Sequence, residues 1–244
     1  MDHDVVKNVV SAGVIVAAVL VVTRQCRKPA LLPGRLFLWL MNRSHRGVTS
    51  WGLEHVSLER DSTILDVGCG GGMTVRTLAG LATSGKVYGI DYSKESVAAS
   101  RRLNADLISA ARVDIRQAAV SHLPYSDATF NLVTAVETHY YWPNPVEDMR
   151  EILRVLKPGG RLLVIAETYK GRSADWVYRP AMMLLRAAYL TVAEHEDLLM
   201  KAGYAPVEIV EDRKHGWICC LGTRPAQRGA PVRDHIQDLS VGGP

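Results

Sequence analysis

Cysteine and net charge are both scarce in this chain of 244 residues, and each scarcity excludes a class of protein. The four cysteines have neither C-x-x-C spacing nor a disulfide-scaffold pattern, which indicates a reduced compartment and predicts no metal centre. A net charge of only +4 does not indicate a nucleic-acid-binding groove. The chain has no internal repeat, and its length suits one α/β domain with appendages.

One long apolar run, residues 8–23, lies between Lys7 and Arg24 near the N-terminus. As a helix these residues would span about 24 Å, short of a bilayer core of about 30 Å. Acidic residues precede the run and no small-residue cleavage site follows it, so a signal peptide is disfavoured. The basic cluster at 24–28 favours a cytoplasmic protein whose residues 8–41 associate with a membrane. The alternative is a helix packed against protein.

The run Ile64–Gly72 carries the strongest signal in the chain. An apolar segment leads directly into four glycines and one cysteine, and a helical pattern follows. This pattern predicts a buried strand and a tight turn, where bare backbone and a helix N-terminus can approach a nucleotide-type ligand. About twenty residues later a second strand ends in Asp91, whose carboxylate can accept two hydrogen bonds from a ribose diol.

The glycine spacing separates two cofactor classes. A dinucleotide-binding turn needs G-x-G-x-x-G, but Met73 occupies the place of the third glycine. With Asp66 two residues before the first glycine, the pattern resembles motif I of the class I S-adenosylmethionine-dependent methyltransferases. Residues 121–133 (SHLPYSDATFNLV) and 153–162 (LRVLKPGGRL) resemble two further motifs of that family, in the same order. The resemblance covers residues 45–223 and points to the small-molecule branch that includes ubiquinone and menaquinone C-methyltransferases.

This resemblance implies an α/β fold with a doubly wound, Rossmann-like sheet of seven strands, mostly parallel and closed by a terminal antiparallel hairpin. The methyltransferase domain is expected at 43–224, with a lid insertion at 168–190. Residues 1–42 would form the hydrophobic anchor segment, and residues 225–244, which have little apolar content, a disordered tail. The predicted strands are 63–67, 87–90, 113–117, 130–136, 161–166, 207–210 and 216–222.

The resemblance also implies a pocket for S-adenosylmethionine, which leaves as S-adenosylhomocysteine. Asp91 would hold the ribose, Tyr92 would flank the adenine, and Trp51 and His55 could face the cofactor. The usual adenine-binding carboxylate falls near Ala119, so the Val120 backbone or the side chain of Ser121 or His122 would replace it. The expected cofactor-binding residues are Asp66, Gly68, Cys69, Gly70, Gly72, Asp91, Tyr92, Ala119, Val120 and Glu137.

Ionisable and aromatic side chains gather just after the fourth strand, where the family holds its methyl acceptor. Methyl transfer expels a neutral leaving group, so a base is needed only when the acceptor carries a proton. His139 is the first candidate for a base or acceptor-binding residue, and Glu137 is the second. Tyr140, Tyr141 and Trp142 could form an aromatic wall that steadies the sulfonium or an apolar acceptor. A hydrogen-bonded structural histidine and simple aromatic packing are the alternatives.

The same stretch lacks the N/D-P-P-Y/F sequence of amino-methylating DNA enzymes, and no Pro-Cys nucleophile follows it. A small-molecule or lipid-like acceptor is therefore expected, and no nucleic acid. Two other functions remain open at this point. One is a catalytically silent, cofactor-binding partner protein at a membrane. The other is an NAD-dependent oxidoreductase, which Met73 and the turn at 157–160 disfavour.

Overall fold

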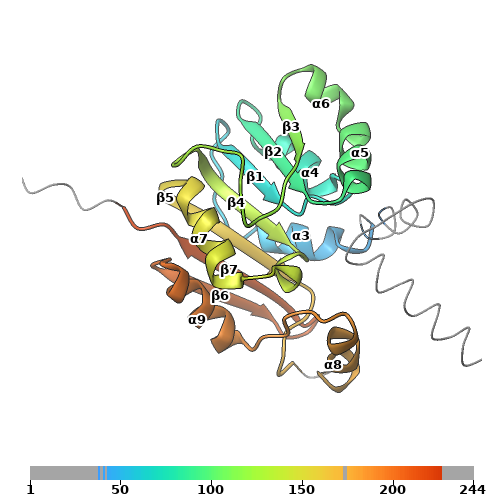
Figure 1. Cartoon of the computed structure of the whole chain (residues 1–244), viewed down its shortest axis with the longest axis vertical. Coiled ribbons are helices and arrows are strands. Elements are labelled where there is room, and N and C mark those ends of the chain that lie inside the picture. Colours follow the sequence, from blue (N-terminus) through green and yellow to red (C-terminus); the bar gives the residue numbers. More distant parts are fainter. Residues whose placement is uncertain (1–37, 39–40, 42, 173–174, 227–244) are drawn as a thin grey trace, which may run out of the picture.

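A single mixed β-sheet with helices on both faces forms the centre of the molecule (Figure 1). The structure is a computed structural model, and it describes residues 38, 41, 43–172 and 175–226. The apolar run at 8–23 lies outside these residues. So does the predicted disordered tail at 225–244, apart from residues 225 and 226. None of the helices that the structure describes is long and apolar enough to cross a membrane.

The seven strands follow the order β3-β2-β1-β4-β5-β7-β6. The first five strands in this order are parallel, and β7 pairs antiparallel with both β5 and β6. The doubly wound sheet with a terminal antiparallel hairpin is therefore confirmed. The strand bounds are β1 Thr63–Val67, β2 Lys86–Asp91, β3 Val113–Gln117, β4 Phe130–Val136, β5 Leu156–Ala166, β6 Val207–Asp212 and β7 Trp217–Thr223.

Strand β5 begins five residues before its predicted start at Arg161. Leu156 already pairs with Phe130 of β4, and the register then shifts so that Arg161 pairs with Leu132. The residues between them, Lys157 to Gly160, form an irregularity inside the strand rather than a turn before it. Gly160 belongs there because a Cβ would lie 2.8 Å from the Lys157 carbonyl oxygen.

The helices are divided between the two faces of the sheet (Figure 1). Side chains of α3, α4 and α5 pack on one face, and those of α7 and α9 on the other. Helix α7 was not predicted, although Pro145 at its first turn and two acidic residues after it form a regular helix start. The helix bounds are α3 Arg46–Leu53, α4 Met73–Leu81, α5 Lys94–Leu103, α6 Ala105–Ser109, α7 Pro145–Val155, α8 Asp175–Leu184 and α9 Val192–Ala202, with a short 3-10 helix, η1, at His139–Tyr141.

The two faces of the sheet carry separate apolar cores, because alternate residues of a strand point to opposite sides. Ile64 belongs to the core under α3 and α4, whereas its neighbour Leu65 belongs to the core under α7 and α9. Cys219 and Cys220 divide in the same way, and both are free thiols. The central strands β1, β4, β5 and β7 contribute residues to both cores, which holds the strand ends that carry the functional residues.

Gly72 joins the glycine turn to the packing of α4 on α5. Its φ is +85°, and a Cβ at this position would lie 2.3 Å from Ser100 Oγ and 2.7 Å from Asn104 Nδ2. The Asn104 amide donates to the Gly72 carbonyl oxygen at 3.0 Å. Asn104 also separates α5 from α6. Any side chain at position 72 would therefore strain the backbone and displace this contact.

Replacing Gly72 with alanine is expected to lower the free energy of unfolding by about 1–3 kcal/mol, through left-handed backbone strain and overpacking. Gly80→Ala is the matched control, since Gly80 lies in the same helix and its Cβ would meet nothing within 4 Å. That change should stabilise the protein by about 0.5–1 kcal/mol through helix propensity. Urea denaturation of both variants measures the difference, and effects of the same sign would contradict the assignment.

Candidate active site

The glycine turn is clamped to the end of the neighbouring strand. The backbone N–H groups of Gly68 and Cys69 both donate to the carbonyl oxygen of Ile90, at 2.8 and 2.9 Å. A Cβ on Gly68 would lie 2.3 Å from Thr138 Oγ1, so only glycine fits beneath the loop that follows β4. The carboxyl ends of β1, β2 and β4 therefore meet around this one turn.

Asp91 extends the same clamp through its side chain. Its Oδ2 accepts from the Gly70 N–H at 3.0 Å, and its Oδ1 accepts from the Ser93 N–H at 2.8 Å. Burial raises the pKa of this carboxyl, while hydrogen bonds from the Ser93 and Gly70 backbone and from the Ser96 side chain act in the opposite direction. A carboxylate offers about four lone-pair sites, so this side chain can still accept a hydrogen bond from a ligand hydroxyl.

A cavity of about 370 Å³ opens beside Asp91 at this edge of the sheet. Backbone and small side chains from Ala118 to Ser121 form one wall, and Glu137 with Thr138 forms another. No carboxylate lies in the first wall, as the sequence predicts. The Ser121 hydroxyl already donates to Asp148 at 2.6 Å. Of the expected cofactor-binding residues, this cavity is lined by Gly68, Asp91, Tyr92, Ala119, Val120 and Glu137.

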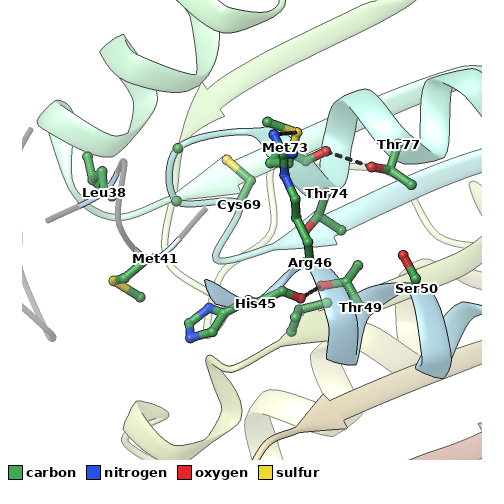
Figure 2. Close-up of a pocket in the computed structure, with 13 residues that line it drawn as sticks. Leu38, Met41, His45, Arg46, Thr49, Ser50, Cys69, Met73, Thr74 and Thr77 are labelled. Atoms are coloured by element: carbon green, nitrogen blue, oxygen red, sulfur yellow. Dashed lines mark hydrogen bonds between the residues drawn. The ribbon is translucent and has the colours of Figure 1, made fainter. Parts of the chain in front are cut away.

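A second cavity, of about 320 Å³, lies between α3 and the glycine turn (Figure 2). Cys69 and Gly70 line it from the turn, and His45, Thr49 and Arg46 line it from α3 and the residue before it. The Cβ position of Gly70 has no atom nearer than 4.0 Å, so bare backbone faces this space. A ligand that follows the glycine turn could therefore extend from one cavity toward the other.

The prediction that Trp51 and His55 face the cofactor is not supported, because the other side of α3 faces the cavity. The Trp51 ring packs edge-on against His55, with centroids 4.9 Å apart, and lies 5.8 Å from Trp217 of β7. Trp51 packs against the core on the sheet, and His55 adjoins it in the turn that follows α3. His45 and Thr49 line the cavity from the opposite face.

Asp66 and Gly72 line neither cavity. Asp66 is buried and accepts from the Thr134 hydroxyl at 2.7 Å, which ties β1 to β4. Burial, followed by the nearby charge of Asp91, raises the pKa of Asp66 to about 7 despite this hydrogen bond. Both residues shape the turn from behind, and their assignment to cofactor contact stays a prediction.

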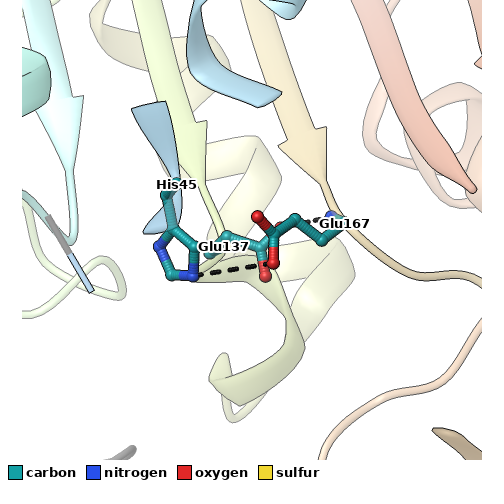
Figure 3. A group of neighbouring side chains, drawn as sticks. All are labelled: His45, Glu137 and Glu167. Carbon is teal, nitrogen blue, oxygen red and sulfur yellow. Dashed lines mark hydrogen bonds and ion pairs between the residues drawn. The ribbon is translucent and has the colours of Figure 1, made fainter. Parts of the chain in front are cut away.

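Three ionisable side chains from three separate elements meet between the cavities (Figure 3). Glu137 follows β4, Glu167 follows β5 and His45 precedes α3. Their donor atoms all lie within 4.8 Å of one another, close enough to share a proton or a cation. His45 Nε2 is 3.8 Å from Glu167 Oε2, and the Glu167 N–H donates to Glu137 Oε1.

Burial governs the protonation of this cluster. It raises the pKa of Glu137 to about 8, and the charge of Glu167 adds to the effect. It also raises the pKa of Glu167, against the attraction of Arg172, and lowers that of His45 to about 4. A neutral imidazole therefore stands beside two carboxyl groups that hold protons readily. Of these three residues only Glu137 was predicted, since neither His45 nor Glu167 lies in a recognisable motif.

His139, the first candidate for the base, contacts another histidine rather than a cavity. It is buried, lines neither cavity, and places its Nε2 3.1 Å from Nε2 of His195 in α9. His195 Nδ1 lies 2.8 Å from the Thr191 carbonyl oxygen, which can only accept. His195 must then carry its proton on Nδ1 and accept at Nε2, so His139 donates. The pair joins η1 to α9, and a base role for His139 stays a prediction that this geometry does not favour.

The aromatic residues of the same stretch divide between cavity and core. Tyr141 and Trp142 line the cavity beside Asp91. Tyr140 is buried, and its hydroxyl donates to the Thr168 carbonyl oxygen at 3.2 Å, which anchors the segment after β5. The prediction of an aromatic wall thus suits Tyr141 and Trp142, whereas Tyr140 lies in the core, where its side chain also hydrogen-bonds to Glu137.

Comparisons with known proteins agree with this geometry. A family model described as a methyltransferase domain matches residues 65–164. "Methyltransferase GfsG" of Streptomyces halstedii is 30% identical over 65% of this chain and 58% of its own length. A demethylmenaquinone methyltransferase of Lactiplantibacillus plantarum is 32% identical over 50% of this chain and 52% of its own length. The chain thus spans little more than half the length of these curated relatives.

Solved structures show the same fold at low identity. A putative methyltransferase of Haloferax volcanii, in complex with the Trm112 activator, superposes with a TM-score of 0.67 at 21% identity, covering 77% of this chain and 93% of that one. Geranyl diphosphate C-methyltransferase of Streptomyces coelicolor has a TM-score of 0.63 at 17% identity, covering 75% and 77%. The fold is therefore the class I methyltransferase fold. A methyltransferase domain model thus matches residues 65–164 of a chain whose fold is that of these methyltransferase structures.

The histidine pair predicts a pH dependence of stability. Burial lowers the pKa of both His139 and His195, so the unfolded chain binds protons near pH 6.5 that the folded chain does not. Stability is therefore full above this pH and falls as the pH decreases below it, by up to about 1.4 kcal/mol per pH unit for each histidine. His139→Gln should flatten the slope of unfolding free energy against pH. The exposed His122→Gln should keep the wild-type slope, and equal slopes in all three proteins would contradict the prediction.

Proposed function

We propose that this protein transfers a methyl group from S-adenosylmethionine to a small-molecule acceptor. The observation that carries the proposal is the Asp91 carboxylate, fixed by the glycine turn at the wall of a 370 Å³ cavity that ends at Glu137. Asp91 suits a ribose diol because its carboxylate lines the cavity and can still accept a hydrogen bond from a hydroxyl. Gly70 leaves bare backbone for the methionine part. The named methyltransferase relatives support the same cofactor.

The cofactor would supply a methyl group on a positively charged sulfur, and the protein supplies position and charge. Asp91 and the turn hold the nucleoside end, and Tyr141 and Trp142 present aromatic faces that suit a cation or an apolar acceptor. The apolar lining favours a small, largely apolar acceptor over a nucleic acid. A lipid-like acceptor, and membrane association through residues 8–41, belong to the same proposal and rest on the apolar run in the sequence.

We assign the base to Glu137 rather than to His139, because Glu137 faces the cavity. An acceptor hydroxyl would pass its proton to this carboxylate while its oxygen attacks the methyl carbon. Glu167 and the neutral His45 adjoin Glu137 and can receive the proton afterwards. A raised pKa makes Glu137 a stronger base than an ordinary carboxylate, which suits an acceptor that ionises above neutral pH.

Asp91→Ala is expected to weaken S-adenosylhomocysteine binding at least tenfold, because charge-assisted hydrogen bonding to the ribose is lost. Isothermal calorimetry measures this, with Asp106→Ala as the control. Asp106 pairs with Arg76 on the exposed surface, far along the chain from the turn. Undiminished binding in Asp91→Ala would remove the central support for the proposed cofactor.

Glu137→Gln is expected to lower kcat by about 10²-fold with little change in S-adenosylhomocysteine affinity, since the amide keeps the cavity filled but cannot take a proton. The base works only when ionised, so wild-type kcat/KM should rise with pH through about 8 and then level off. The rise should be absent in the variant. Glu54→Gln, on the exposed end of α3, is the control. A retained pH-dependent rise in Glu137→Gln, with loss of activity in His139→Ala instead, would return the base role to His139.

A further inference from the structure

Helix α8 exposes an apolar face to solvent. Trp176, Pro180, Met183 and Leu184 follow the spacing i, i+4, i+7 and i+8, which places them on one side of the helix. Trp176 is 80% exposed, Met183 71% and Leu184 52%. Met182, on the other side, is buried. This helix therefore has a packed side and a second apolar side that no other described residue covers.

Positive charge borders this apolar face. Arg179 is exposed and precedes Met183 by one helical turn. Arg186 is exposed in the turn just after the helix, where its N–H donates to the Met183 carbonyl oxygen at 3.0 Å. The Arg172 guanidinium lies 4.3 Å from the Tyr178 ring centroid at the start of the helix. Asp175 is the only acidic residue between Glu167 and Glu194. A tryptophan and long apolar side chains edged by arginine are typical of helices that lie in a membrane interface.

The base of α8 is anchored, so the exposed face is held in a defined place. Lys170 N–H donates to the Leu190 carbonyl oxygen at 2.8 Å and closes the segment that carries the helix. Ala188 N–H donates to the Tyr140 carbonyl oxygen at 2.8 Å and ties the segment to η1. The helix thus projects from the end of the sheet that bears the cavities (Figure 1). The same segment begins directly after Glu167.

The charge pattern and the rest of the chain both point to lipid as the occupant. A protein partner would be expected to offer acidic or polar matches at one site, whereas two arginines beside a tryptophan match an anionic headgroup layer. Residues 8–23 form an uncharged apolar run that is followed by Arg24, Arg27 and Lys28. Two separate parts of the chain therefore have membrane-surface chemistry.

We propose that the exposed face of α8 binds the surface of an anionic lipid bilayer. Trp176, Met183 and Leu184 enter the interface, and Arg179 and Arg186 contact the lipid phosphates. The mouth of the active site would then stand near the bilayer, where an apolar acceptor concentrates. This binding does not require methyl transfer, so it can be tested apart from the proposed function.

Quenching of tryptophan fluorescence by brominated phosphatidylcholine tests the proposal on the full chain, with and without phosphatidylglycerol in the vesicles. The share of quenching that disappears in Trp176→Phe reports on α8 alone, even when residues 8–23 also bind lipid. We expect Trp176→Phe to remove a clear share and Trp217→Phe, the control, to remove little. Arg179→Glu/Arg186→Glu should weaken binding to anionic vesicles about tenfold or more. Lys94→Glu/Arg102→Glu, with both residues exposed on α5, should not.

Two results would overturn the proposal. Quenching that is identical in wild type and Trp176→Phe would show that α8 stays out of the bilayer. Trp176 emission that is already shielded without lipid would show that residues 8–23 or a second copy cover the face, and sedimentation velocity of Trp176→Ser separates these two cases. S-adenosylhomocysteine binding by each variant confirms that the fold is intact and keeps this test distinct from that of the cofactor site.

Discussion

The site depends on a single clamp between the ends of two parallel strands. Two backbone donors of the glycine turn share the Ile90 carbonyl oxygen, and a third holds the Asp91 carboxylate. These bonds hold the turn and the carboxylate together before any ligand arrives. Binding a nucleoside there requires little further ordering of the protein, which is the usual basis of preorganised affinity. The glycine turn contributes to the walls of both cavities, so fixing the turn also fixes their shape.

The chemistry of the site follows from how its charges are buried. Two carboxylates and one imidazole meet beyond the clamp with one nearby guanidinium, that of Arg172, acting on Glu167. In such surroundings the ionised forms are disfavoured, so protons can be taken up and passed on near neutral pH. The second histidine group, His139 with His195, lies in the core and serves the packing of α9. Position relative to the cavity, rather than residue type, separates the proton-exchanging cluster from the histidine pair in the core.

Much of the fold could be predicted, because it rests on local and periodic signals. The seven strands, the capping box at Thr191 and the opposite orientations of Cys219 and Cys220 all follow from short-range patterns. The glycine turn and Asp91 were predictable for the same reason. The errors concern long-range geometry. His45 and Glu167 are 122 residues apart in the chain, and no local pattern shows that they meet. The helix face of α3 that meets the sheet was assigned to the wrong side because an aromatic residue near a cofactor motif suits either role.

The backbone at Glu137 adds a constraint that concerns evolution more than mechanism. Its φ of +55° lies in the left-handed region, which a residue with a Cβ occupies at a disadvantage of about 1–2 kcal/mol relative to glycine. Glycine would therefore fit this position better as a matter of folding alone. A glutamate kept there means that the most stable sequence for this fold and the sequence with a carboxylate at the cavity are different sequences. Selection for thermal stability, if applied without a demand for activity, would favour the loss of this side chain.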